Sequence, residues 1–177
     1  STQQHFTYGE RANTRIYCGI IADNTYLYLG TDNGILVYNY RTDKYEQPDT
    51  DFPTDVRTMV LQGDTLWIGS LNGLYTYQLK SRQLNHFDSK QTGLPHNTIY
   101  SIIHTKDNQI YIGTYNGLCR YVQASEKFEN ILLPVNRGGS NLFVNSLLED
   151  TTRQCIWIGM EGYLFQYNPT IGEMKAI

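Results

Sequence analysis

The chain has 177 residues, a formal net charge of −3 and 40% hydrophobic residues, which is enough apolar material for a packed core. Charges of both signs are mixed along the sequence without a basic patch, so we expect no nucleic-acid partner. No apolar run approaches the ~18 residues that a membrane helix needs, so we expect no membrane insertion by this segment. The chain starts at Ser1 without a signal peptide, which predicts a processed protein or a piece of a longer one.

One pattern occurs four times along the chain, and each copy centres on a short apolar stretch that ends in glycine. The stretches are Leu27-Tyr28-Leu29-Gly30, Leu66-Trp67-Ile68-Gly69, Ile110-Tyr111-Ile112-Gly113 and Ile156-Trp157-Ile158-Gly159. The glycines are 39, 44 and 46 residues apart, and a tyrosine follows each of them by eight residues. Periods of roughly 40–45 residues made of short strands are typical of β-propeller blades.

Each copy predicts four antiparallel strands joined by short turns, which together form one blade. In chain order the expected strands are 16–22, 26–31, 35–40 and 44–47; 56–61, 65–70, 74–79 and 83–87; 98–104, 109–114, 118–123 and 127–132; 143–149, 155–160, 163–168 and 174–177. We therefore predict an all-β chain, 1–177, with blades at about 14–50, 51–92, 93–135 and 136–177, and no helix. Residues 5–8 resemble a fourth strand and predict part of a preceding blade or a closing strand.

Two details of the repeat carry further expectations. Second strands are apolar on both faces, which predicts that neighbouring blades cover both sides of each. The turn before the third strand contains Asn-Gly in copies one, two and three, whereas in copy four glycine comes one residue early, at Gly162, so that turn should differ.

Catalytic and metal-binding patterns are weak in this sequence. The four histidines show no metal-ligand spacing, and no nucleophile elbow or phosphate-binding loop occurs, so we expect no metal, no cofactor and no enzyme activity in this segment. Glu149 and Asp150 are adjacent in a strand and should face opposite ways, which favours a turn role over catalysis. Cys18, Cys119 and Cys155 fall in three different blades and are expected to be small buried hydrophobes, although their redox state stays open.

Several segments resemble the two-component regulator propeller repeat, and the resemblance covers nearly the whole chain. Gly93-Leu94-Pro95-His96-Asn97 matches its opening, Leu66-Trp67-Ile68-Gly69-Ser70 matches its core, and Asn116-Gly117-Leu118 matches the following turn. The Gly-His and Trp-Asp pairs of WD40 blades and the double glycine of kelch repeats are missing. The remaining inter-blade loops depart from the Gly-Leu-Pro opening.

This resemblance implies a setting and a function. Such repeats form the periplasmic sensor region of Bacteroides-type hybrid two-component systems, in which seven-bladed propellers precede an inner-membrane helix and a histidine kinase. The implied role is a non-catalytic sensor that responds to oligosaccharides. The chain would then be a fragment of a sensor or a short relative, and a closed four-bladed ring stays an alternative. An open arc would expose the apolar faces of its first and last blades, which we expect to contact the remaining blades or another copy of the chain.

Candidate ligand-binding residues lie in the loops that enter the first strands and in the turns between second and third strands, because these crowd one face of a propeller. They are Arg15, Arg57, Asn97, Tyr115 and Arg137. The arginines and the asparagine can hydrogen-bond hydroxyl or carboxylate groups of a glycan, and Tyr115 can stack on a sugar ring. Ordinary solvated loop residues are the simpler interpretation. A protein-interaction module without a small-molecule ligand is the alternative function, and an enzyme ranks last.

Overall fold

The computed structural model describes residues 14–48, 50–135 and 142–177, and it contains four separate four-stranded antiparallel sheets that follow one another along the chain. The expected strand at residues 5–8 and the candidate Arg137 lie outside the described residues. In every sheet the strands pair in sequence order, so each sheet is a meander. The predicted all-β fold of four blades is confirmed, and each sheet is called a blade below, numbered 1 to 4 in chain order.

The strands match the predicted ranges within one or two residues at either end. Blade 1 consists of β1 (Ile16–Ala22), β2 (Tyr26–Thr31), β3 (Gly34–Asn39) and β4 (Lys44–Glu46). Blade 2 consists of β5 (Val56–Gln62), β6 (Thr65–Ser70), β7 (Gly73–Gln78) and β8 (Leu84–Phe87). Blade 3 consists of β9 (Ile99–His104), β10 (Ile110–Thr114), β11 (Gly117–Val122) and β12 (Lys127–Ile131). Blade 4 consists of β13 (Val144–Asp150), β14 (Cys155–Met160), β15 (Tyr163–Asn168) and β16 (Glu173–Ala176).

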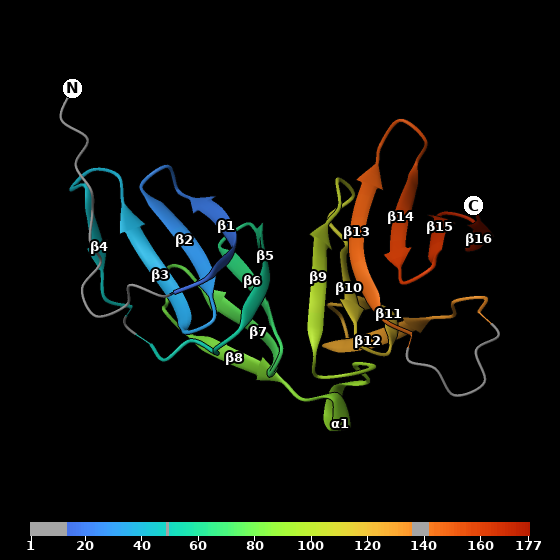
Figure 1. Ribbon diagram of the computed structural model, residues 1–177, viewed down its shortest axis with the longest axis horizontal. Coiled ribbons are helices and arrows are strands. Elements are labelled where there is room, and N and C mark those ends of the chain that lie inside the picture. Colours follow the sequence, from blue (N-terminus) through green and yellow to red (C-terminus); the bar gives the residue numbers. More distant parts are fainter. Residues whose placement is uncertain (1–13, 49, 136–141) are drawn as a thin grey trace.

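The blades are arranged as an open arc with their first strands innermost (Figure 1). β1 lies beside β5, β5 beside β9, and β9 beside β13, so consecutive blades touch through these strands. In Figure 1, β5 and β9 lie between β1 and β13, and the sheets do not close into a ring. The first strands therefore line the concave side of the molecule, as the inner strands of a propeller do.

Three hydrophobic clusters hold the arc together, one at each junction between blades. The junction of blades 2 and 3 contains Trp67 and Leu74 on one side and Ile102 and Ile112 on the other. All five residues of β10 are buried, because blades 2 and 4 cover its two faces. The expectation that second strands are covered on both sides is confirmed for the blades inside the arc.

The turns between second and third strands follow one chemical rule in blades 1 to 3. In blade 3 the Thr114 hydroxyl donates to the carbonyl of Gly117 at 2.9 Å and accepts from the backbone N–H of Asn116 at 3.1 Å. Thr31 and Ser70 make the same pair of bonds in blades 1 and 2. Met160 has no hydroxyl to offer in blade 4, and the left-handed residue there is Gly162, with φ of 76°. The predicted difference in the fourth turn is confirmed.

The expectation that the chain has no helix is wrong. A short helix, α1 (Ser89–Thr92), connects blades 2 and 3. The Asp88 side chain accepts from the backbone N–H of Lys90 at 3.0 Å as an N-cap, and Gly93 ends the helix in the left-handed region with φ of 82°. The sequence contains both cap residues, and Gly93 is also the first residue of the repeat motif. Within the described ranges, no helix has the length and apolar character needed to cross a bilayer.

Candidate functional site

A β-bulge interrupts the first strand of every blade at the same position. In blade 2, Val56 pairs with Ser70 and Thr58 pairs with Gly69, so Arg57 is an extra residue without a partner across the ladder. Tyr17, Tyr100 and Asn145 are the corresponding extra residues in blades 1, 3 and 4. A bulge re-aims the side chain of its extra residue, and bulges are frequent beside active sites. These four bulge residues lie on the innermost strands of the arc.

Packing on either side of the bulge explains its position. The residue before it fits against the strand glycine of the preceding blade, as Val56 does against Gly30 and Val144 against Gly113. The residue after it is small and fits against the glycine of its own blade, as Thr58 does against Gly69. Val56, Ile99 and Val144 are fully buried. Because both flanking residues are locked in place, the bulge residue is free to vary and projects away from the core.

Arg57 occupies the most distinctive environment among the bulge residues. Its guanidinium lies over the ring of Tyr17 at 3.8 Å, so bulge residues of adjacent blades contact each other. One terminal nitrogen is 3.5 Å from a carboxylate oxygen of Asp55, which is a weak ion pair on a side chain that is 30% exposed. The buried Nε has no hydrogen-bond partner among the described residues. Arg57 therefore keeps unused hydrogen-bonding capacity.

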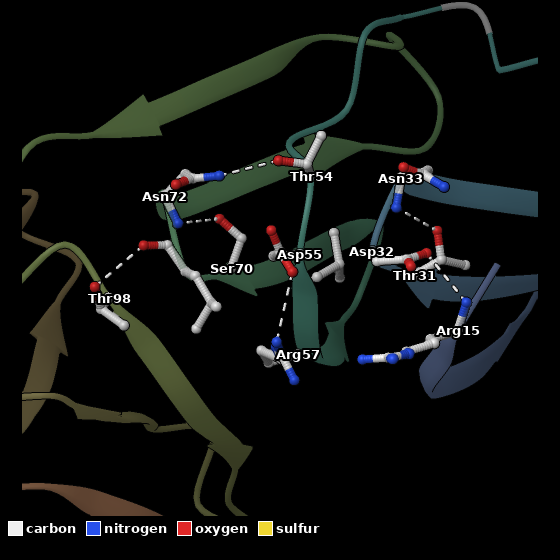
Figure 2. Close-up of polar contacts among 12 residues, drawn as sticks. Arg15, Thr31, Asp32, Asn33, Thr54, Asp55, Arg57, Ser70, Asn72 and Thr98 are labelled. Carbon is white, nitrogen blue, oxygen red and sulfur yellow. Dashed lines mark hydrogen bonds and ion pairs between the residues drawn. The ribbon is translucent and has the colours of Figure 1, made fainter. Parts of the chain in front are cut away.

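Arg15 lies close by and is held through its backbone alone. Its N–H donates to Asp32 Oδ1 at 3.1 Å and its carbonyl accepts from the N–H of Asp32 at 3.2 Å. Its guanidinium has no partner in the described part of the chain. Figure 2 shows the Arg15 and Arg57 side chains projecting on the same side of the loops, below the turn residues. We call this end of the arc, with the turns at 32–33, 71–72 and 115–116, the loop face.

Hydrogen bonds between successive loops run along the loop face and hold it in place. Asp55 N–H donates to the carbonyl of Asp32 at 3.1 Å, and Leu71 N–H donates to the carbonyl of Asp55 at 3.2 Å. The Thr98 hydroxyl donates to the carbonyl of Leu71 at 3.1 Å (Figure 2). Tyr115 N–H donates to the carbonyl of Thr98 at 3.0 Å. The series alternates between a bond inside a blade and a bond to the next blade. It links Arg15 to Tyr115 through backbone groups and the hydroxyl of Thr98.

Four aromatic rings gather on the loop face between blades 3 and 4. The Phe143 ring lies 4.2 Å from that of Tyr100 and 5.7 Å from that of Tyr115, both edge-on. His96 lies 5.2 Å from Tyr115. All four are half-buried, so part of each ring is open to solvent. Amphipathic rings in this state are suited to stacking on the apolar face of a sugar.

The structure thus separates the predicted site residues into groups. Arg15 and Arg57 share one part of the loop face, and Tyr115 belongs to the aromatic cluster. The Asn97 side-chain oxygen accepts from the backbone N–H of Ser89 at 2.9 Å, which gives this residue a structural role at the start of α1. Arg137 is outside the described residues.

Sequence reasoning missed the other bulge residues and Phe143. A usable signal was present, because each first strand begins with an aliphatic residue, a variable residue and a small one. The triplets are Ile16-Tyr17-Cys18, Val56-Arg57-Thr58, Ile99-Tyr100-Ser101 and Val144-Asn145-Ser146.

Titratable groups outside the loop face serve packing or turns. Burial raises the pKa of the Cys18 thiol to about 11 and raises that of Cys119 as well, so both are neutral at physiological pH. Both carboxylate oxygens of Glu149 accept from the backbone N–H of Lys106 in the preceding blade. Across the described ranges, no group of three histidine, cysteine, aspartate or glutamate side chains is placed to hold a metal ion.

Comparison with known proteins identifies the repeat. Residues 93–116 match the family model described as two component regulator propeller. This segment of blade 3 is thus similar to the two component regulator propeller repeat. The match covers the Gly93-Leu94-Pro95 opening, β9 and β10, as expected from the sequence. No curated protein matches the chain.

A search of solved structures found a match to nearly the whole chain. The chain is 77% identical to part of an extracellular domain assigned to the hybrid two component system BT4673 of B. thetaiotaomicron, with a TM-score of 0.93. The match covers 99% of this chain and 24% of that domain, so the chain spans about a quarter of its length. This chain therefore resembles one segment of an extracellular domain, which agrees with the expected extracytoplasmic location.

More distant structures share the fold alone. The extracellular domain assigned to the hybrid two component system BT3049 of B. thetaiotaomicron is 19% identical, with a TM-score of 0.74 over 92% of this chain and 21% of that one. The WD40 repeats of RRP9 are 12% identical, with a TM-score of 0.67 over 93% of this chain and 51% of theirs. Propeller blades therefore account for the architecture in each case.

Proposed function

We propose that the chain is a ligand-recognition segment of a hybrid two-component sensor that responds to oligosaccharides, and that it acts by binding without catalysis. In the bacterial cell it would belong to the periplasmic part of an inner-membrane protein. Arg57 carries this proposal. Its guanidinium lies 3.8 Å above Tyr17, its Nε is buried without a partner among the described residues, and its ion pair with Asp55 is weak.

The chemistry of the loop face suits an acidic oligosaccharide. Arg15 and Arg57 present donors that can form charge-assisted hydrogen bonds with a carboxylate or sulfate on the sugar. The aromatic cluster of His96, Tyr100, Tyr115 and Phe143 offers ring faces one blade further along the arc. Separate positions for the charged group and for ring stacking favour a chain of sugar units over a single one.

A binding experiment on the extracytoplasmic domain that contains this chain tests the proposal. We expect isothermal titration to detect at least one member of a panel of acidic oligosaccharides, uronic-acid-containing and sulfated. Arg57→Ala should weaken that binding at least tenfold, because a hydrogen bond to a charged group contributes about 1.5–3 kcal/mol. Arg41→Ala is the matched control, since Arg41 is exposed in the turn between β3 and β4 and changes the net charge equally.

Two results would contradict the proposal. One is that the intact domain binds none of the oligosaccharides in the panel. The other is an Arg57→Ala variant that binds the same oligosaccharide as tightly as the Arg41→Ala control does.

The alternative function, a protein-interaction module, has its own supporting observation. Apolar side chains are exposed at both ends of the arc, including Ile16 at 56% and Leu148 at 64%. Such faces suit contact with the remaining blades or with another copy of the chain. A specific protein partner, bound by a domain that responds to no sugar, would favour this alternative.

A further inference from the structure

A pocket of about 500 Å³ lies between blades 2 and 3. It extends from Gln62 and Thr65, at the end of the arc opposite the loop face, to Phe87 and to Thr92 of α1. Arg57 and the residues of the aromatic cluster do not line it. Its volume falls within the ~300–1,000 Å³ that small-molecule sites commonly enclose.

Aromatic rings form the apolar wall of this pocket. Trp67 and Phe87 are stacked, with ring centroids 5.8 Å apart and an interplanar angle of 10°. The edge of Tyr121, from blade 3, meets Trp67 at 4.8 Å. Trp67 is 2% exposed, whereas Phe87 and Tyr121 are half-buried and present part of their surface to the pocket.

The polar wall contains hydrogen-bonding groups that the protein does not use. Thr76 is 6% exposed and lines the pocket, yet its hydroxyl has no hydrogen-bond partner among the described residues. Asn85 is directly opposite Thr76 on the neighbouring strand, so the two side chains share one face of blade 2. The amides of Asn85 and Gln123 and the hydroxyl of Tyr121 are likewise unpartnered within the described part of the chain. Asn85 and Gln123 are exposed and the Thr76 hydroxyl atom is not itself buried, so these groups are open to the pocket and can hydrogen-bond a ligand that enters it.

The unpartnered groups are almost all uncharged. Hydroxyls and amides combine donors and acceptors, which is what a ligand with many hydroxyl groups requires. Glu126 is the one carboxylate among the residues that line the pocket, and it is exposed. Burial raises the pKa of Tyr121, and the nearby Glu126 adds to the shift, so the phenol keeps its proton and can donate.

A larger pocket between blades 3 and 4 provides a contrast. It measures about 550 Å³, but its carboxylates are already occupied by the protein. Asp107 accepts from Thr105, Glu149 accepts from Lys106 N–H, and Asp150 accepts from Arg153. The pocket beside Thr76 differs in that it has an aromatic wall and a single, exposed carboxylate.

We propose that the pocket between blades 2 and 3 binds one ring of a neutral sugar. The Thr76 hydroxyl and the Asn85 amide hydrogen-bond adjacent hydroxyls of that ring, and the Phe87 and Tyr121 rings contact its apolar face. This site is distinct from the loop face and does not depend on the function proposed there.

Saturation-transfer NMR and titration of the full chain with the methyl glycosides of glucose, galactose, mannose and N-acetylglucosamine test this site. We expect at least one glycoside to bind, and Thr76→Val and Asn85→Ala each to weaken its binding at least tenfold. Valine fits the fold at this position, because Val37 is the corresponding residue of blade 1. The melting temperature of Thr76→Val should therefore be no lower than that of the parent.

Two controls separate this site from the loop face. Asn130→Ala removes an exposed asparagine of β12 that does not line the pocket, and it should leave glycoside binding unchanged. Arg57→Ala should also leave it unchanged, even where it abolishes binding of acidic oligosaccharides. The proposal is overturned if none of the four glycosides binds, if Thr76→Val and Asn85→Ala bind like the parent, or if Arg57→Ala removes the binding.

Discussion

At the scale of single residues, Asp150 shows how one carboxylate fixes the end of a blade. Its oxygens accept from the backbone N–H of Arg153 at 2.9 Å, from the Arg153 guanidinium at 2.9 Å, and from the indole N–H of Trp157 at 3.2 Å. These bonds, the backbone one foremost, lower the pKa of Asp150 from 3.8 to about 2. In blade 2, Gln62 accepts from the indole of Trp67 at 3.1 Å from the same strand position. The turn role expected for Asp150 is thus met by hydrogen bonds within its own blade.

We predict that Asp150→Asn destabilises the fold at neutral pH and flattens its acid dependence. A carboxylate whose pKa is lower in the folded state stabilises fully above its ordinary value. That contribution disappears as the pH falls from about 3.8 to about 2. Urea unfolding at pH 7 and across this acid range measures both effects. Asp51→Asn, at an exposed carboxylate without a hydrogen-bond partner in the described part of the chain, is the control. Equal acid dependence of the Asp150→Asn variant and the parent would contradict the prediction.

At the scale of elements, the strand glycines let neighbouring blades approach closely. A Cβ added to Gly113 would lie 2.6 Å from Val144 Cγ1 and 2.9 Å from the Val144 carbonyl oxygen, and it would also contact Ser101 Oγ. Gly159 occupies the same position in blade 4 and would meet only Ser146, chiefly at its hydroxyl. The difference arises because blade 4 has no following blade in the described arc.

We predict that Gly113→Ala costs about 2–3 kcal/mol in unfolding free energy, because buried backbone and Val144 must move, whereas Gly159→Ala costs about 1 kcal/mol or less. Chemical denaturation of both variants under the same conditions measures the two costs. Similar losses for the two would mean that the glycines serve the geometry of their own blade and not the contact between blades.

At the scale of elements, most strands could be predicted because the same strand pattern occurs four times in the sequence. The Leu-Trp-Ile-Gly core gave β6 its full range, and Cys155–Met160 and Tyr163–Asn168 were predicted residue for residue. Helix α1 was missed because four residues are too few to show a periodic pattern of apolar residues. Its only sequence signals are the cap residues Asp88 and Gly93.

The candidate site was predictable in part only. Loop-face arginines follow from strand order, since the segments that enter first strands must share one end of the arc. The bulges could not be predicted from the alternation of apolar and polar residues along the strand. An extra residue such as Tyr100 leaves the apolar pattern before and after it unchanged. The sequence contains no sign of the role proposed for Thr76, because a threonine that lines a pocket between two blades can be recognised only when its surroundings are known.

At the scale of the whole molecule, the two tryptophans report the position of a blade within the arc. Trp67 and Trp157 occupy the same position of their second strands, and both donate their indole N–H to the last residue of the first strand. Trp67 is 2% exposed because blade 3 covers it, whereas Trp157 is half-buried on the outer face of blade 4. Leu148, beside Trp157 on that face, is 64% exposed.

We predict that the two tryptophans of the chain differ clearly in fluorescence. Trp157→Phe leaves Trp67 as the sole emitter, and its emission should be blue-shifted and resistant to acrylamide quenching. Trp67→Phe leaves Trp157, whose emission should lie further to the red and be quenched several-fold more strongly. Circular dichroism confirms that both variants remain folded. Equal quenching of the two would show that something covers the outer face of blade 4 in solution.

The bulges carry an evolutionary consequence. Because Tyr17, Arg57, Tyr100 and Asn145 are spare residues in their ladders, exchanging them leaves strand register and interlocking of the blades untouched. These four positions can therefore be substituted one at a time during evolution with little loss of folding stability. Receptors that diverge in what they detect while keeping one scaffold would accumulate their differences there first.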